Sequence, residues 1–353
     1  MKKVLVTGIS GFAGSTIAIE LRAFAENIDI IGIDNLSRKG SEKNLIKLHD
    51  QQIKVFRGDI RCESDLSLLP KVDWVIDCAA NPSVLAGLNG KDSSKQLMEH
   101  NLLGTINLLE YCKLHKAGLI LLSTSRVYSA SSLGNLSVKS CNNRFEITND
   151  DIDGLSLAGI AENFPTFAPN SLYGSSKLAS EQLILEYAHS FDFPVWINRC
   201  GVLAGPGQFG KADQGIFSFW IHSFKEKKPL KYIGFGGNGF QVRDALHPKD
   251  LVPLLLKQMH EHSKEVPKII NIGGGIENSL SLKELSNWCE QRFGPKNICS
   301  STEDRPMDAP WIVMDTSLAQ KHWNWSPKIK IQQLLEDTAT FADRNPDWLS
   351  VTT

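Results

Sequence analysis

A glycine-rich loop near the N-terminus constrains the fold of this chain more than any other feature. The stretch VTGISGFAG places Gly8, Gly11 and Gly14 three residues apart, after an apolar segment at 2–8 and at the start of a helical pattern at 13–26. Glycine permits a tight turn and a close approach of backbone amides to phosphate, and the helix N-terminus adds unpaired N–H groups. The spacing G-x-x-G-x-x-G is a variant of the commoner G-x-G-x-x-G. It predicts a strand–loop–helix unit that binds phosphate.

Further short apolar segments alternate with helical patterns through the first half of the chain. Each apolar segment is rich in β-branched residues and is bounded by turn or polar residues, whereas the segment 93–115 has apolar residues at helical spacing. Buried strands that alternate with helices indicate an α/β fold, a Rossmann-type doubly wound parallel sheet. The expected strands after the first are 28–34, 53–59, 72–80 and 118–124.

The second half of the chain is richer in loops and tryptophan, which favours a smaller α/β substrate-binding region. We expect a dinucleotide-binding domain at 1–195 and a mainly substrate-binding domain at 196–353, with segments returning to the first domain. Residues 129–170 are rich in Ser and Asn, show little periodicity and are long for a connection inside a compact domain. Such irregular excursions commonly form part of a site or a lid.

Asp34, together with the glycine loop, predicts that the phosphate-containing ligand is a dinucleotide. It ends the second predicted strand, twenty residues beyond Gly14, where a carboxylate can accept hydrogen bonds from an adenosine ribose. A carboxylate there also repels a 2′-phosphate and so favours NAD over NADP. Arg38 lies close by and tempers this preference, because a guanidinium can bind phosphate.

Charge and cysteine content exclude several other classes of protein. The 38 Lys and Arg nearly balance the 39 Asp and Glu, so no overall basic field attracts nucleic acid or an anionic membrane. The seven cysteines are scattered without a C-x-x-C pair, and the histidines show no metal-ligand spacing, so we expect no disulfide framework and no metal site. No apolar segment approaches the roughly 20 residues that cross a bilayer. A cytoplasmic protein is expected.

The stretch NSLYGSSKL, residues 170–178, places Tyr173 and Lys177 one helical turn apart. Taken alone, this spacing is common in ordinary helices. Beside an expected nicotinamide, an ammonium near a tyrosine can stabilise the phenolate and lower its pKa from about 10 toward working pH. A phenolate is a suitable base for a sugar hydroxyl. Ser123 and Thr124 end the strand 118–124 and Ser125 follows it, so all three supply hydroxyl groups at the same edge of the sheet.

Together these motifs resemble the extended short-chain dehydrogenase/reductase family of NAD-dependent sugar-nucleotide epimerases and dehydratases, over nearly the whole chain. The resemblance implies Tyr173 as the catalytic acid/base, Lys177 as its partner on the ribose and Thr124 as the catalytic hydroxyl. It also implies a set of NAD-binding residues: Gly8, Gly11, Phe12, Ala13, Gly14, Asp34, Asn35, Ser37, Arg38, Asp59, Ile60, Ala79, Ala80, Asn101, Ser123, Tyr173, Lys177 and Cys200.

The residues after Thr124 distinguish between reactions of the family. Family 4,6-dehydratases have Asp-Glu there for elimination, whereas this chain has Ser125 and Arg126, which disfavours elimination. Several stretches, among them DNLSRKG and GNGFQVRDALHPKD, are similar to the branch that inverts C2 of a CDP-activated hexose. That similarity implies substrate binding by Thr124, Gln208, Gln214, Arg243 and Arg305, with Arg243 on a diphosphate oxygen.

Two other functions stay open. One is a nucleotide-sugar 4-epimerase or a net reductase of the same family, and the other is a dinucleotide-binding sensor without catalytic activity. The complete Thr, Tyr and Lys set argues against the sensor. By resemblance to the family we also expect a homodimer, or a dimer of dimers, formed through the helices at 93–115 and 174–190.

Overall fold

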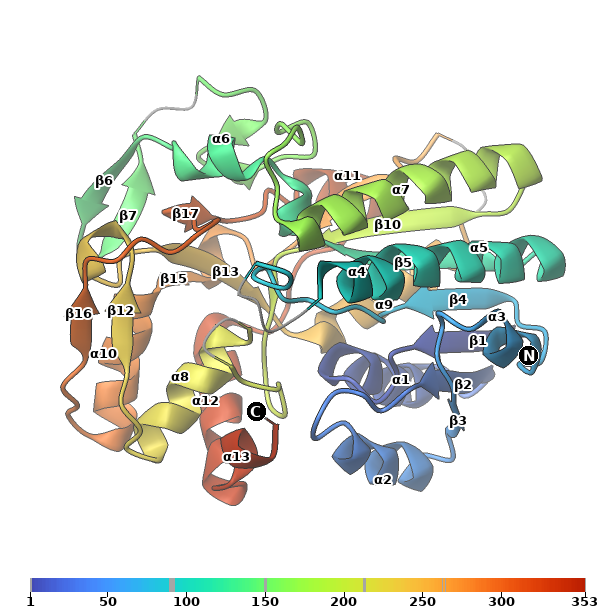
Figure 1. The fold of residues 1–353 in the computed structure, drawn as a ribbon, viewed down its shortest axis with the longest axis horizontal. Coiled ribbons are helices and arrows are strands. Elements are labelled where there is room, and N and C mark those ends of the chain that lie inside the picture. Colours follow the sequence, from blue (N-terminus) through green and yellow to red (C-terminus); the bar gives the residue numbers. More distant parts are fainter. Residues whose placement is uncertain are drawn as a thin grey trace.

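A seven-stranded parallel sheet lies at the centre of the protein (Figure 1). The computed structural model describes residues 2–88, 93–148, 151–211, 214–261, 263 and 265–352. The order β14-β10-β5-β4-β1-β2-β3 reverses direction beside β1, as in a doubly wound sheet, so the predicted Rossmann-type α/β fold is confirmed. The strands are β1 (Lys2–Thr7), β2 (Ile28–Asp34), β3 (Lys54–Arg57), β4 (Trp74–Asp77), β5 (Gly118–Thr124), β10 (Val195–Cys200) and β14 (Ile269–Ile272).

Helices cover both faces of this sheet because its strands are apolar on both sides. Along β1, Val4 and Val6 point into one buried cluster, whereas Leu5 points into another on the opposite face. The first cluster is closed by α1 (Phe12–Phe24), α2 (Glu42–Asp50), α9 (Val252–Gln258) and α11 (Ser317–Trp323). On the second face lie α3 (Glu63–Ser67), α4 (Ser94–Met98), α5 (Gly104–His115) and α7 (Leu172–Phe191).

The segment predicted as one helix at 93–115 has three parts. Between α4 and α5 lies a π-helical stretch, Glu99–Leu103, in which the backbone is wider than in an α-helix. The structure places Asn101 in this stretch, where its side chain is turned toward α7. A local change of helical type thus directs a polar side chain into the packed interface between two helices.

A smaller α/β region packs beyond the carboxyl ends of β5 and β10 (Figure 1). Its core is a separate apolar cluster around Trp220 and Tyr232, whose rings stack 5.7 Å apart. The strands are β11 (Val202–Leu203), β12 (Lys231–Ile233), β13 (Val242–Leu246), β15 (Ser279–Ser281), β16 (Cys299–Ser301) and β17 (Trp311–Ile312). The helices are α8 (Ile216–Lys225), α10 (Leu282–Phe293), α12 (Ile331–Arg344) and α13 (Trp348–Thr352), with 3₁₀ turns at Phe235–Gly237, Pro248–Leu251 and Ile276–Asn278.

The irregular excursion at 129–170 folds onto this smaller region. Its hairpin is fixed by Arg144, which donates to Ser279 Oγ at 2.6 Å and pairs with Glu284 at 3.6 Å. Buried Leu133, Leu155 and Phe164 join a fourth apolar cluster with β17. The excursion contains α6 (Ala130–Gly134), β6 (Val138–Cys141), β7 (Arg144–Ile147), β8 (Leu155–Ser156) and β9 (Gly159–Ile160).

Candidate active site

A cavity of about 450 Å³ opens where the central strands end, between the sheet and the smaller region. Most residues that the sequence predicted for cofactor or substrate line it: Gly8, Gly11, Phe12, Ala13, Gly14, Asp34, Asn35, Ser37, Arg38, Asp59, Ile60, Ala79, Ala80, Ser123, Thr124, Tyr173, Cys200, Gln208 and Gln214. Four predicted residues do not line it: Asn101, Lys177, Arg243 and Arg305.

The glycine loop forms one wall of the cavity and depends on the absence of side chains. Gly8 has a φ of +58°, and a Cβ there would lie 2.9 Å from the Cα of Ala79 on the neighbouring strand loop. A Cβ on Gly14 would lie 2.9 Å from Gly8 C and Ile9 Cα, and nearer still to Gly8 O. The loop therefore closes tightly on the first turn of α1 and leaves no side chain at its glycines on this wall of the cavity. This cradle fits a pyrophosphate.

Asp34 lies at the adjoining end of the cavity, where β2 stops. Its two carboxylate oxygens accept backbone hydrogen bonds from Ser10 N at 2.9 Å and Leu36 N at 2.8 Å. Burial raises the pKa of Asp34, and these two hydrogen bonds oppose the rise. The carboxylate is thus held in one orientation beside the glycine loop, with lone pairs left for ribose hydroxyls.

Arg38 and Gln214 connect this end of the cavity to the smaller region. Arg38 Nη1 donates to Gln214 Oε1 at 3.1 Å, and its guanidinium lies 5.6 Å from the centre of the Phe209 ring.

Asp59 lines the same cavity and is hydrogen-bonded to Arg61 and Asn35. Burial raises the pKa of Asp59, but these hydrogen bonds outweigh it and hold the pKa well below its usual range. Asp59 is therefore a fixed anion on the same wall.

Tyr173 and Thr124 meet at the carboxyl end of β5. Tyr173 lies in the first turn of α7, which begins where Ser171 Oγ accepts from Gly174 N at 3.0 Å. Its phenol forms a side-chain hydrogen bond with Thr124, and both residues line the cavity opposite the glycine loop. The helix cap and the strand end thus place two hydroxyl groups side by side.

Lys177 follows one turn later on α7, and its side chain is 2 % exposed. Burial raises the pKa of the Cys78 and Cys200 thiols, which line the cavity, and the positive charge of Lys177 opposes part of that rise. The ammonium therefore lies behind the cavity wall, near Cys78 after β4 and Cys200 at the end of β10.

The lowered pKa that we predict for Tyr173 in the presence of oxidised nicotinamide is not seen in the polypeptide alone. Burial raises the pKa of Tyr173 to about 12, and the Cys200 thiol adds to the rise. The groups that act in the other direction are Thr124, through its hydrogen bond, and Arg126, through its charge. An ionised Tyr173 near neutral pH therefore needs a further positive charge in the cavity.

Two sets of buried polar contacts hold these elements in place. Short sequence patterns reveal neither set. Asn101 Oδ1 accepts from Asn81 N at 2.8 Å, and its Nδ2 donates to Ser176 Oγ at 3.0 Å, so it ties α7 to the loop after β4. Glu181 on α7 pairs with Arg199 of β10 at 2.7 Å and accepts from Ser123. Asn101 and Glu181 therefore orient the walls of the cavity from behind.

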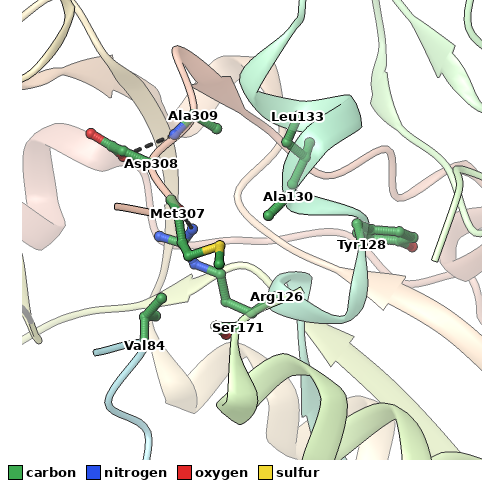
Figure 2. A pocket seen from close by; sticks show the side chains of 9 residues that line it. All are labelled: Val84, Arg126, Tyr128, Ala130, Leu133, Ser171, Met307, Asp308 and Ala309. Atoms are coloured by element: carbon green, nitrogen blue, oxygen red, sulfur yellow. Dashed lines mark hydrogen bonds between the residues drawn. The ribbon is translucent and has the colours of Figure 1, made fainter. Parts of the chain in front are cut away.

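Arginines collect at the far side of the cavity, beside the smaller region. Arg243 Nη2 pairs with Asp308 Oδ1 at 2.7 Å, and burial lowers the pKa of Arg243. Arg126 lines both the large cavity and a small one next to it, which Asp308, Met307 and Tyr128 also line (Figure 2). Figure 2 shows the Arg126 side chain reaching toward Met307, whose carbonyl oxygen accepts from Nη1 at 3.1 Å.

Gln208 offers the cavity an unsatisfied acceptor. Its amide nitrogen donates to Leu203 O, whereas its Oε1 is buried and has no hydrogen-bond partner among the described residues. A buried carbonyl oxygen without a donor is costly, by about 1–3 kcal/mol. A ligand with a donor group at this position removes that cost.

Other candidate features lie outside the site. His247 Nδ1 accepts from Lys249 N at 3.1 Å, and burial lowers the pKa of His247 to about 4, so it caps a 3₁₀ turn. In the part of the chain that the structure describes, no three His, Cys, Asp or Glu side chains gather as metal ligands. None of the described helices is long and apolar enough to cross a membrane.

Comparisons with known proteins agree on one family. A model of the NAD dependent epimerase/dehydratase family matches residues 4–273. The chain is 31 % identical to the CDP-paratose 2-epimerase of Salmonella typhi over 332 residues, which cover 93 % of this chain and 95 % of that one.

Solved structures share the fold over the full length. The UDP-glucuronic acid 4-epimerase from Bacillus cereus, in complex with UDP-glucuronic acid and NAD, has a TM-score of 0.76 and 25 % identity, with 97 % of this chain and 99 % of that chain covered. The dTDP-glucose 4,6-dehydratase from Bacillus anthracis, in complex with NAD, has a TM-score of 0.77 and 25 % identity, with 100 % of both chains covered.

Proposed function

The chain belongs to the NAD dependent epimerase/dehydratase family, and from that premise we propose that it inverts C2 of a CDP-activated hexose. The family uses NAD and acts on nucleotide sugars, and the glycine cradle with Asp34 fits NAD. The choice of C2 and of CDP is supported by the 31 % identity to a CDP-paratose 2-epimerase over nearly the whole chain.

One observation carries the chemical part of the proposal: the hydrogen-bonded hydroxyls of Thr124 and Tyr173 line the same cavity as the glycine loop. Tyr173 removes the proton from the sugar hydroxyl when the carbon is oxidised and returns a proton when it is reduced. Thr124 orients the reacting oxygen. NAD held by the glycine loop and Asp34 would supply reversible hydride transfer at that carbon, and return of the hydride to the opposite face would invert the sugar with no net redox change.

The remaining predicted residues bind the ribose of the cofactor and the substrate, and Lys177 is the first of them. The ammonium holds the ribose and adds positive charge behind the cavity wall. Gln208 uses its free Oε1 to accept a hydrogen bond from the substrate, and Gln214 lies on the same cavity wall beside Arg38. By resemblance to the family we also assign the diphosphate to Arg243 and Arg305, although neither lines the cavity of the protein alone and Arg243 is paired there with Asp308.

Inversion at C4 is a second candidate, because the fold matches a UDP-glucuronic acid 4-epimerase at 25 % identity. A panel of CDP-, UDP-, GDP- and dTDP-hexoses separates the two. We expect a CDP-hexose to give its C2 epimer by proton NMR, and a deuterium placed at C2 to stay at C2. Inversion of C4, net formation of reduced cofactor, or solvent deuterium at C2 would each contradict the proposal.

We also propose a homodimer in which α5 and α7 of one chain pack on those of its partner. The two helices contact each other along the outer face of the sheet. Leu103 and Leu114 lie on or beside α5 and are 40 % and 77 % exposed. Burial of such leucines against a second copy gains about 25 cal/mol for each Å² of apolar surface removed from water.

A further inference from the structure

Arg126 occupies a position in the cavity to which neither the fold nor the cofactor assigns a role. It lies in the 3₁₀ turn Ser125–Val127, and its backbone N–H donates to Thr124 Oγ1 at 3.2 Å. The turn follows β5 directly, so the side chain leaves the sheet beside the reacting hydroxyls. It lines the large cavity together with Thr124 and Tyr173 and also lines the small cavity beside Asp308. Its guanidinium therefore lies between the catalytic hydroxyls and the pair Arg243–Asp308.

The positive charge of Arg126 is not balanced within the protein. Among the described residues, no carboxylate lies within ion-pairing distance of its guanidinium, and its recorded side-chain hydrogen bond goes to the neutral carbonyl of Met307. Asp308, the acid whose charge acts on it, is already paired with Arg243. Burial, with the charge of Arg243, lowers the pKa of Arg126 to about 10. It stays protonated at neutral pH, and an uncompensated cation of this kind favours an electron-rich ligand.

We propose that Arg126 is a specificity-determining residue whose guanidinium binds an oxygen atom of the hexose between Tyr173 and the Arg243–Asp308 pair. The proposal rests on the proposed function, because it places the sugar where the hydroxyls of Thr124 and Tyr173 meet. It assigns the diphosphate to Arg243 and the sugar ring to Arg126. The ligand group is a hydroxyl, carbonyl or carboxylate oxygen, each of which accepts a hydrogen bond from a guanidinium.

The position of Arg126 also limits the reactions that are open to the oxidised sugar. A carbonyl on the ring makes the neighbouring C–H bond acidic, and a base beside it would remove that proton and start an elimination. A guanidinium cannot act as that base, because it holds no free lone pair when protonated. Instead it donates to the sugar oxygen and keeps the ring in place while it turns. Arg126 therefore favours return of the sugar to the alcohol over loss of water.

Arg126 also affects the proton of Tyr173. The charged or titratable groups around that phenol are Arg126 from the 3₁₀ turn, Cys200 from the end of β10, and Lys177 on its own helix behind the wall. Burial raises the pKa of Tyr173, and Arg126 lowers it. Removal of the guanidinium thus raises this pKa further, so the acid limb of the pH–rate profile moves to higher pH. A lysine at the same place retains most of the effect.

Binding calorimetry separates a sugar contact from a structural role. The protein carries Tyr173→Phe to prevent turnover and is loaded with NAD, and the variants are R126Q, R126K and R144Q. Arg144 is the matched control, because it holds, through Ser279, the hairpin of the excursion that begins just after Arg126, and it lies outside both cavities. The probes are CDP-glucose, UDP-glucuronate, CDP and UDP.

We expect R126Q to weaken the better-bound nucleotide sugar about 10- to 100-fold, the value of hydrogen bonds from a charged group. Binding of the matching nucleoside diphosphate should change less than about threefold, and R126K should recover part of the loss. If R126Q weakens binding of the nucleotide sugar and of the nucleoside diphosphate by the same factor, Arg126 contacts the diphosphate and the proposal is overturned. Unchanged binding in a folded R126Q would overturn it in favour of a structural bond to Met307.

The pH–rate profile of the enzyme without the Tyr173 substitution is the second readout. A shift of its acid limb in R126Q, absent in R144Q, supports the proposal, and coincident limbs contradict it. The proposed function can fail separately. If the enzyme does not invert C2, the product of the wild-type enzyme is different, but the difference in sugar binding between R126Q and R144Q remains.

Discussion

A single methyl group at Gly14 tests whether the glycine loop is built to leave room for a pyrophosphate. In Gly14→Ala the new Cβ would lie 2.9 Å from Gly8 C and Ile9 Cα, where ordinary contacts begin at 3.4 Å. Gly8 O would lie nearer still, so the first turn of α1 must move by more than the 0.5 Å that separates these two distances. Because the opposing atoms belong to the backbone, no side chain can rotate away. Overpacking of this kind costs about 1–3 kcal/mol of stability.

The displaced amides no longer meet the phosphate oxygens together. Loss of one hydrogen bond to a charged group is worth about 1.5–3 kcal/mol, so we expect the Kd for NAD to rise about 10- to 100-fold. Titration calorimetry with NAD measures the affinity, and thermal unfolding measures the stability, which should fall by a few degrees.

Gly11→Ala is the matched control in the same loop. Its Cβ would lie 3.1 Å from Gly8 O, its one close neighbour, so a shift of 0.3 Å relieves the contact. We expect a smaller effect on both NAD affinity and melting temperature. The reasoning is refuted if Gly14→Ala binds NAD like the wild type, or if Gly11→Ala is the more damaging change.

Three further predictions follow from the buried and exposed contacts. Glu181→Gln leaves the buried guanidinium of Arg199 without its anion, so we expect a loss of about 3–5 kcal/mol in unfolding free energy, whereas the exposed Glu186→Gln on the same helix should change little; equal melting temperatures would refute this. Asp34→Ala should weaken NAD about tenfold and narrow the preference over NADP, whereas Asp29→Ala at the start of the same strand should do neither; an unchanged ratio of the two affinities argues against the ribose contact. Light scattering after gel filtration should give twice the mass of one chain, and Leu103→Glu with Leu114→Glu should halve it; a wild-type monomer contradicts the proposed dimer.

The strands of the central sheet could be predicted closely because each is a short apolar segment bounded by turn residues. β2 and β5 occupy the predicted ranges 28–34 and 118–124. The helix expected at 93–115 was only partly right, since the π-helical stretch Glu99–Leu103 interrupts it. A change from α to π geometry leaves the apolar periodicity nearly unaltered, so the sequence pattern does not reveal it.

The cavity was predictable where its residues follow strand ends, and less so where contacts are long-range. Thr124 and Tyr173 are 49 positions apart, and their meeting follows from a strand end and a helix start at one edge of the sheet. The pair Glu181–Arg199 and the unbalanced charge of Arg126 had no such signal, because both depend on which polar side chains burial brings together. Within the polypeptide alone, desolvation outweighs the charges near Tyr173 and raises its pKa, so the expected lowering still depends on the positive charge of the oxidised nicotinamide.

The most direct test of the account is the activity of Tyr173→Phe, because the phenol hydroxyl is the group that moves the proton. Phe keeps the ring and its packing in the cavity wall and removes the oxygen that meets Thr124. With the nucleotide sugar that the wild-type enzyme inverts, we predict a fall in kcat of about 10²- to 10⁴-fold. NAD affinity and melting temperature should stay near their wild-type values. A folded, NAD-loaded Tyr173→Phe protein that inverts the sugar at the wild-type rate would contradict the account.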